Sequence, residues 1–239
     1  MKNRVLLLGG IMIAVFFFSC DKKADSSYAK YLNAAEIAKP GKVDSMEILP
    51  GYNRALIKFK VSPDRRVNKI KIDYYTSISY LINTKTIDVT ETDFGKFKEL
   101  LIDNLPEANL FVNIVTYSAA GDSSSVSDGV GAVYGNRYAS LVANRIFSNI
   151  TTTDGIKSIN FAGEQSRPRD STLFYPLQKT VLTYPTILGD TNTIEFSPHT
   201  NTIPVPDIAD SGTITHYSVY KPTSNAIDVF KSSGVSVTF

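Results

Sequence analysis

The stretch Ala55-Leu56-Ile57-Lys58-Phe59-Lys60-Val61 decides the fold, because apolar and polar residues alternate along it with a period of two. In an extended strand, the odd-numbered residues of this stretch lie on one side and its two lysines lie on the other. Lys69–Tyr75 repeats the alternation as KIKIDYY. Strands with one apolar face need a second layer to cover that face, so these stretches predict a β-sandwich.

Further runs of strand-forming residues extend this prediction over residues 40–135. Turn residues separate the runs, as in Pro50-Gly51-Tyr52-Asn53. Seven short strands within about 100 residues are typical of an immunoglobulin-like or fibronectin type III domain. The predicted strands are Val43–Ile48, Ala55–Val61, Lys69–Tyr75, Thr84–Val89, Phe97–Ile102, Leu110–Tyr117 and Val126–Val133.

The rest of the chain predicts a second sandwich. Tyr138, Leu141, Val142 and Ile146 recur at helical spacing, so we expect a connecting helix within residues 136–150. Residues 151–239 return to β patterns, although the alternation fails around Pro176 and through 200–214. The fold class is therefore all-β, with two consecutive β-sandwich domains. The strands expected in the second are Ile159–Phe161, Leu173–Tyr184, Ile194–Phe196, Thr215–Lys221 and Val235–Phe239.

The first 39 residues predict a leader and a tether. A basic start is followed by the apolar run Val5–Phe18, which is too short to span a membrane as a helix, so residues 1–19 are predicted to be a signal peptide. Ser19-Cys20 after this run resembles the lipobox of bacterial lipoproteins, in which the cysteine thiol carries a diacylglycerol. The alternative is an ordinary cleaved leader with a leftover thiol. Residues 20–39 then form a lipid tether with a short helix from Tyr28 to Ala35.

Composition excludes several functions. Without the leader the chain has 23 basic and 23 acidic side chains, so no nucleic acid partner is expected. Cys20 is the only cysteine, which excludes disulfides and cysteine nucleophiles beyond it. His199 and His216 lack zinc-site spacing and are predicted to lie on the surface. We therefore expect no catalytic residue, no metal site and no cofactor, and predict that the protein is not an enzyme.

Several short stretches carry a resemblance to a known family. They are Pro40–Ser45, Pro50–Arg54, Val133–Gly135 with Tyr138, and Asn144-Arg145. Over residues 28–146 the chain resembles an uncharacterised family of Bacteroidetes lipoproteins with a fibronectin-type-III-like N-terminal domain. Phe59 departs from that family, in which a tryptophan is common. The resemblance implies an outer membrane lipoprotein of the cell envelope, exposed on the surface, and supplies no activity.

The expected function is binding. As the resemblance implies, an accessory role in glycan capture for polysaccharide utilisation is preferred. The alternatives are a structural or adhesion module that binds another envelope or host protein, and a hydrolase. Sugar sites use aromatic faces, and the chain has no tryptophan, so tyrosines at turns or solvent faces are the candidates, although each is also explained as ordinary strand surface or core. They are Tyr52, Tyr75, Tyr80, Tyr175 and Tyr184.

Lipidation of Cys20 predicts the behaviour of a single variant. Cys20→Ala should abolish incorporation of labelled fatty acid and release the protein from membranes, because two or three acyl chains are what hold such a protein at a bilayer. Metabolic labelling and membrane fractionation measure both effects. Continued membrane pelleting of the unlabelled variant would contradict the anchor.

Overall fold

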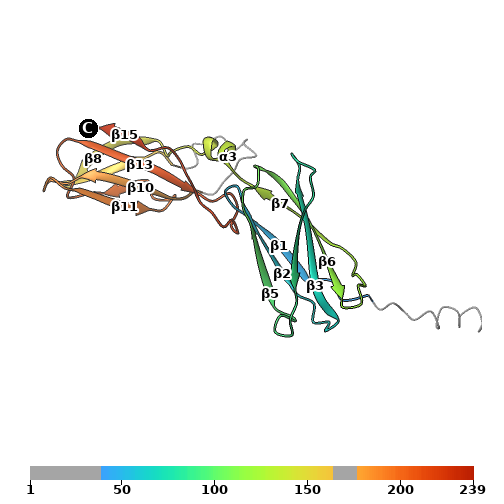
Figure 1. The fold of residues 1–239 in the computed structure, drawn as a ribbon. Helices are drawn as coiled ribbons and strands as arrows, with labels where there is room; N and C mark the ends of the chain where they lie inside the picture. Colours follow the sequence, from blue (N-terminus) through green and yellow to red (C-terminus); the bar gives the residue numbers. More distant parts are fainter. Residues whose placement is uncertain (1–38, 164–176) are drawn as a thin grey trace, which may run out of the picture. The chain divides into compact units, whose positions relative to one another are not determined.

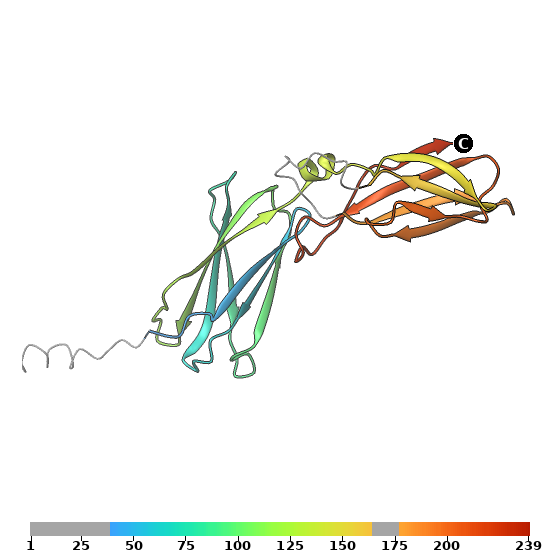
Figure 2. The ribbon, with the colours of Figure 1, turned by 180° about the vertical axis from the view of Figure 1, so that it is seen from behind.

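The computed structural model describes residues 39–163 and 177–239, and their regular secondary structure is almost entirely β-strand (Figures 1 and 2). Pro40–Phe239 form one compact unit. The predicted leader, Cys20 and the helix expected from Tyr28 lie outside the described residues. No helix of the described residues is long and apolar enough to cross a membrane.

The first sandwich contains the seven predicted strands, which are confirmed with small shifts at their ends. One sheet has the order β1-β2-β5 and the other β4-β3-β6-β7, and every pair is antiparallel. This is the two-layer arrangement that the alternating pattern predicts. The strands are β1 (Ser45–Pro50), β2 (Ala55–Lys60), β3 (Val67–Thr76), β4 (Asn83–Asp88), β5 (Phe97–Ile102), β6 (Ala108–Ser118) and β7 (Ser127–Val133).

The core of this sandwich is built from the inward residues of the central strands. In β2, Ala55, Ile57 and Phe59 are completely buried. They face buried residues of β3 and β6, among them Ile72 and Leu110. Phe59 thus fills the centre of the core. Since side chains alternate along a strand, the same register turns the remaining residues of β3 and β6 toward solvent.

The second sandwich repeats the strand order of the first. Its sheets have the orders β12-β9-β8 and β11-β10-β13, and both β14 and β15 pair with β13. Each strand therefore corresponds to the strand seven places earlier, with β14 and β15 sharing the place of β7. The strands are β8 (Phe147–Thr153), β9 (Ile156–Phe161), β10 (Leu177–Pro185), β11 (Thr191–Phe196), β12 (Thr202–Pro204), β13 (Thr213–Tyr220), β14 (Phe230–Lys231) and β15 (Val235–Thr238).

The segment between the sandwiches differs from the helix predicted over 136–150. Helix α3 spans only Asn136–Leu141, and β8 begins at Phe147. The strand was missed because only its first and fourth residues are even half-buried, so it lacks alternation. β12 and β14 were missed because they have three and two residues, too few to establish a period.

Burial of Phe59 makes a quantitative prediction. Phe59→Ala should lower the free energy of unfolding by about 3–5 kcal/mol, through lost transfer energy and the cavity left behind. Phe97→Ala is the matched control, because Phe97 lies on neighbouring β5 and is 57% exposed, and it should cost less than about 1 kcal/mol. Urea denaturation of both variants measures the difference. Equal losses would contradict this placement of the core.

Candidate functional site

The stretches that carry the family resemblance meet residues 225–230 of the second half. The Tyr52 ring lies 5.5 Å from Phe230, and the Tyr138 ring packs edge-on at 4.5 Å from the same residue. The Tyr52 hydroxyl donates a hydrogen bond to Asn136 in α3. Phe230 is only 3% exposed. These rings form a junction, which we define as the contact of Tyr52, Tyr134 and Tyr138 with Phe230.

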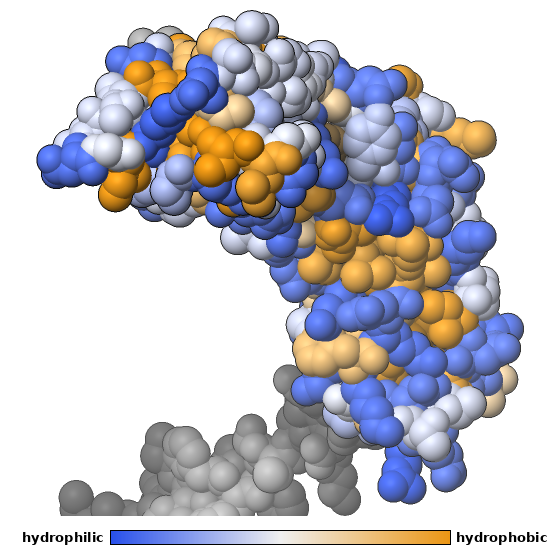
Figure 3. All heavy atoms as spheres, turned by 90° about the vertical axis from the view of Figure 1, so that its left-hand side faces the viewer, coloured by the Kyte–Doolittle hydropathy of each residue, from blue (hydrophilic) through white to orange (hydrophobic). Residues whose placement is uncertain are grey.

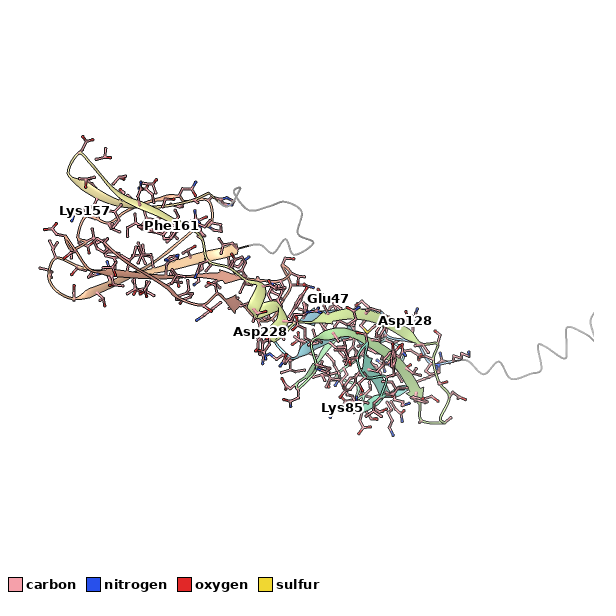
Figure 4. The ribbon with its side chains drawn as sticks, turned by 90° about the horizontal axis from the view of Figure 1, so that it is seen from above. Glu47, Lys85, Asp128, Lys157, Phe161 and Asp228 are labelled. Atoms are coloured by element: carbon pink, nitrogen blue, oxygen red, sulfur yellow. The ribbon has the colours of Figure 1, made fainter. Side chains whose placement is uncertain are left out.

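An ion pair supports the junction. Arg54 donates from both Nε and Nη2 to the carboxylate of Asp228, at 2.9 and 2.6 Å, and the backbone N–H of Tyr52 donates to the same carboxylate at 2.8 Å. The hydrogen bond from Arg54 is the largest cause that lowers the pKa of Asp228, against the opposing effect of burial. Figure 4 labels Asp228 and Glu47. Glu47 accepts a hydrogen bond from Asn225, which is close to Asp228 in the sequence.

Gly51 allows the second half to come this close. A Cβ at this position would lie 2.6 Å from an Asp228 oxygen and 2.7 Å from Ile227, closer than real side chains approach. The backbone N–H of Ile227 also donates to the Pro50 carbonyl at 2.8 Å. Pro50–Arg54 therefore has a packing role here, and Tyr52, although 41% exposed, belongs to the junction.

Arg145, another residue of the resemblance, is buried in the second sandwich. Its guanidinium donates to the Thr200 carbonyl at 2.8 Å and to Asn201 at 2.6 Å, and it lies 5.5 Å from the Phe161 ring. Its own carbonyl oxygen lies 3.0 Å from Nε2 of His216. The prediction that both histidines lie on the surface is therefore wrong for His216, which is 1% exposed and whose pKa is lowered by burial. His199 is exposed, as predicted.

Two predicted tyrosines lie together on the outer face of sheet β4-β3-β6-β7. Tyr75 of β3 is opposite Phe111 of β6, and Phe111 is opposite Val130 of β7. The Tyr75 and Phe111 rings are stacked, with centroids 4.9 Å apart and planes 10° from parallel. Tyr80, which is 77% exposed, lies 6.4 Å from Tyr75. We call Tyr75, Tyr80, Phe111 and Val130 the aromatic row.

A second row lies beside the aromatic row on the same face, two residues along each strand. We call it the polar row, and it consists of Asp73, Asn113 and Asp128. Asp73 is opposite Asn113, which is opposite Asp128, labelled in Figure 4. Lys71 lies 2.8 Å from one oxygen of Asp73, and Thr84 donates to the other at 2.5 Å. Burial opposes ionisation of Asp73, but these two hydrogen bonds outweigh it and the pKa of Asp73 is lowered. The face therefore offers flat apolar rings beside charged and amide groups.

Apolar side chains continue into the β3–β4 loop. Ile78, Tyr80, Leu81 and Ile82 are each more than 60% exposed. Exposed apolar residues also occur elsewhere, and the face drawn in Figure 3 shows them as separate patches between polar residues. The loop is distinctive because its members are nearly consecutive and lie next to stacked rings.

The remaining predicted tyrosines lie elsewhere. Tyr184 is buried in the second sandwich, where its hydroxyl donates to Asp207 at 2.9 Å and accepts from Asn192 at 3.0 Å. Burial is the main cause that raises the pKa of Tyr184, followed by the hydrogen bond to Asp207. Tyr175 lies outside the described residues. Of the four candidate tyrosines within the described ranges, the structure thus brings together Tyr75 and Tyr80.

The strand orders of both halves define a pair of consecutive fibronectin type III-like sandwiches. The chain belongs to the DUF4998 family, described as a domain of unknown function, which matches residues 20–230. A search of the curated proteins found no match. The fold, with an open sheet face as its candidate site, fits a binding or structural module. In the described part of the chain, no three His, Cys, Asp or Glu side chains form a group that could hold a metal ion.

Three solved structures show distant similarity. A two-domain fibronectin type III segment of chicken tenascin aligns at 8% identity and TM-score 0.33, covering 83% of this chain and 99% of that chain. The FN1–FN3 domains of chicken CNTN1 align at 8% identity and TM-score 0.43, covering 84% and 65%. A family 76 glycoside hydrolase from a bovine Bacteroides thetaiotaomicron strain aligns at 17% identity and TM-score 0.31, covering 40% and 20%. The fold assignment rests on the strand order.

The Asp228 ion pair predicts a pH dependence of stability. The lowered pKa means that ionised Asp228 stabilises the folded state above about pH 4, and that this stability is lost as pH falls through the folded-state pKa. The stability difference between wild type and Asp228→Asn should therefore be largest near pH 7 and shrink toward pH 3.

Urea denaturation at a series of pH values measures this difference. Arg54→Gln removes the largest cause of the lowered pKa and should reduce the same pH-dependent component, leaving the part that comes from the Tyr52 N–H. A wild-type advantage over Asp228→Asn that stays constant from pH 7 to pH 3 would contradict a stabilising pair.

Proposed function

We propose that the chain is a non-enzymatic binding protein of the cell envelope that captures glycans on the aromatic row of its first sandwich. It is held at the outer membrane through lipid on Cys20, with its body exposed on the cell surface. There it acts as an accessory to polysaccharide utilisation. The observation that supports the binding site is the stacked pair Tyr75–Phe111 beside the polar row.

The chemistry of the two rows suits sugars. A pyranose presents C–H groups on its face and hydroxyls around its edge, so a flat ring packs against the face while neighbouring polar groups bind the edge. Asn113 offers both donors and an acceptor, and the Asp73 carboxylate accepts from hydroxyls. Apart from Tyr80 of the β3–β4 loop, the residues of both rows lie on paired strands, which hold the side chains at fixed spacing.

The exposed loop favours a second candidate function. Contiguous exposed apolar residues are typical of protein contact sites, and Ile78, Leu81 and Ile82 are each more than 60% exposed. A structural or adhesion module that binds another envelope or host protein would use this loop. The two candidates differ in the residues on which binding depends.

Substitution of the aromatic row tests the glycan proposal. Tyr75→Ala and Phe111→Ala should each weaken binding of the best ligand from a panel of host and plant glycans about two- to tenfold, because aromatic contacts contribute roughly 0.5–1.5 kcal/mol each. Tyr117→Ala is the matched control, since Tyr117 lies on the same face of β6 further along the strand. Titration calorimetry of soluble residues 21–239 measures the affinities.

The outcomes separate the two candidates. Unchanged affinity in Tyr75→Ala and Phe111→Ala would remove the aromatic row from the site. Failure of every glycan to bind, together with binding of envelope protein that is lost in Leu81→Ser, would favour the adhesion module. Loss in Tyr117→Ala equal to that in Phe111→Ala would indicate a general effect on the sheet.

A further inference from the structure

The aromatic row has a neighbour on its other side. Two residues before Phe111 on β6 is Asn109, which is opposite Ala132, two residues after Val130 on β7. Since alternate residues share a face and lie ~7 Å apart, Asn109 and Ala132 continue the outer face by one further step. Ser77 extends the step to β3, because its N–H donates to the Asn109 carbonyl at 2.9 Å.

Ser77, Asn109 and Ala132 line a cavity of about 490 Å³. Ile78 of the exposed loop lines it, as do Arg137, Tyr138 and Leu141 of α3. Its volume lies within the range of ~300–1,000 Å³ that is usual for small-molecule sites. The aromatic row is therefore adjacent, along the same sheet face, to a cavity that paired strands line in part.

Some polar groups of the cavity bind other parts of the protein, and others face solvent. Both oxygens of Glu107 accept backbone hydrogen bonds, from Arg137 at 2.8 Å and Tyr138 at 2.9 Å, so this carboxylate holds the start of α3. The Arg137 side chain is 84% exposed, with its Nε 3.8 Å from Glu107. Within residues 39–163 and 177–239 the side-chain amide of Asn109 has no hydrogen-bond partner. Asn109 and Arg137 therefore present donors and one acceptor to whatever enters.

We infer that this cavity is a second sugar subsite, so that the protein binds linear glycans of several units in preference to short ones. The inference rests on the proposed function, because one glycan must lie on the aromatic row before its chain reaches the cavity. Rings stacked on Tyr75 and Phe111 direct the chain along the face, and Asn109 and Arg137 bind the hydroxyls of the units beyond. The apolar wall of Ile78 and Leu141 packs against their C–H groups.

The test compares two lengths of one glycan. Soluble residues 21–239 are titrated with the disaccharide and the hexasaccharide of the cello-, xylo- and manno-oligosaccharide series. Wild type should bind the hexasaccharide of one series at least tenfold more tightly than its disaccharide. Asn109→Ala and Arg137→Ala should each weaken hexasaccharide binding about two- to tenfold and leave disaccharide binding unchanged, whereas Tyr75→Ala should weaken both.

Matched controls come from the opposite end of the same sandwich. Asn68→Ala and Arg65→Ala replace the same residue types at exposed positions outside the cavity, and both lengths should bind them as they bind wild type. Equal affinity of wild type for both lengths, or equal losses for both lengths in Asn109→Ala, would overturn the subsite while leaving the aromatic row intact. Absence of binding in these three series and in the whole panel of host and plant glycans would overturn the subsite and the glycan proposal together.

Discussion

The period of two in β3, β6 and β7 is the constraint on which both the core and the candidate site depend. Burial of Ile72 and Leu110 fixes the register of the sheet, and that register places Tyr75 opposite Phe111 on the outer face. A slip by one residue would exchange the two faces, exposing the core residues and burying the rings. The outer face is therefore specified by the same interaction that stabilises the sandwich, which explains how an open sheet surface holds aromatic side chains in fixed positions.

The family resemblance has a structural explanation. Gly51 admits the segment around Asp228, Arg54 binds its carboxylate, and Tyr138 packs on Phe230. Arg145 binds carbonyl groups inside the second sandwich. These residues hold secondary-structure elements together. The family stretches consequently identify the architecture, whereas the aromatic row of the proposed glycan site lies outside them.

The sequence predicted the strands that alternate and missed those that do not. All seven strands of the first sandwich have apolar alternation or turn residues at their ends, whereas β8 is mostly exposed and β14 has two residues. Of the candidate site, Tyr75 and Tyr80 were predicted as tyrosines at turns or solvent faces. Phe111 was missed because only tyrosines were considered as ligand-binding residues. The alternation along β6 already placed Phe111 among its outward residues. Cross-strand neighbours such as Asn109 and Ala132 need a register, which a single sequence does not supply.

Tyr138 lines the cavity at the end of the aromatic row and also packs against Phe230 of the second half. Because one side chain takes part in both places, a substitution at Tyr138 would alter the cavity wall and the contact with Phe230 together. The short helix α3 is thus part of both contacts as well as a connection.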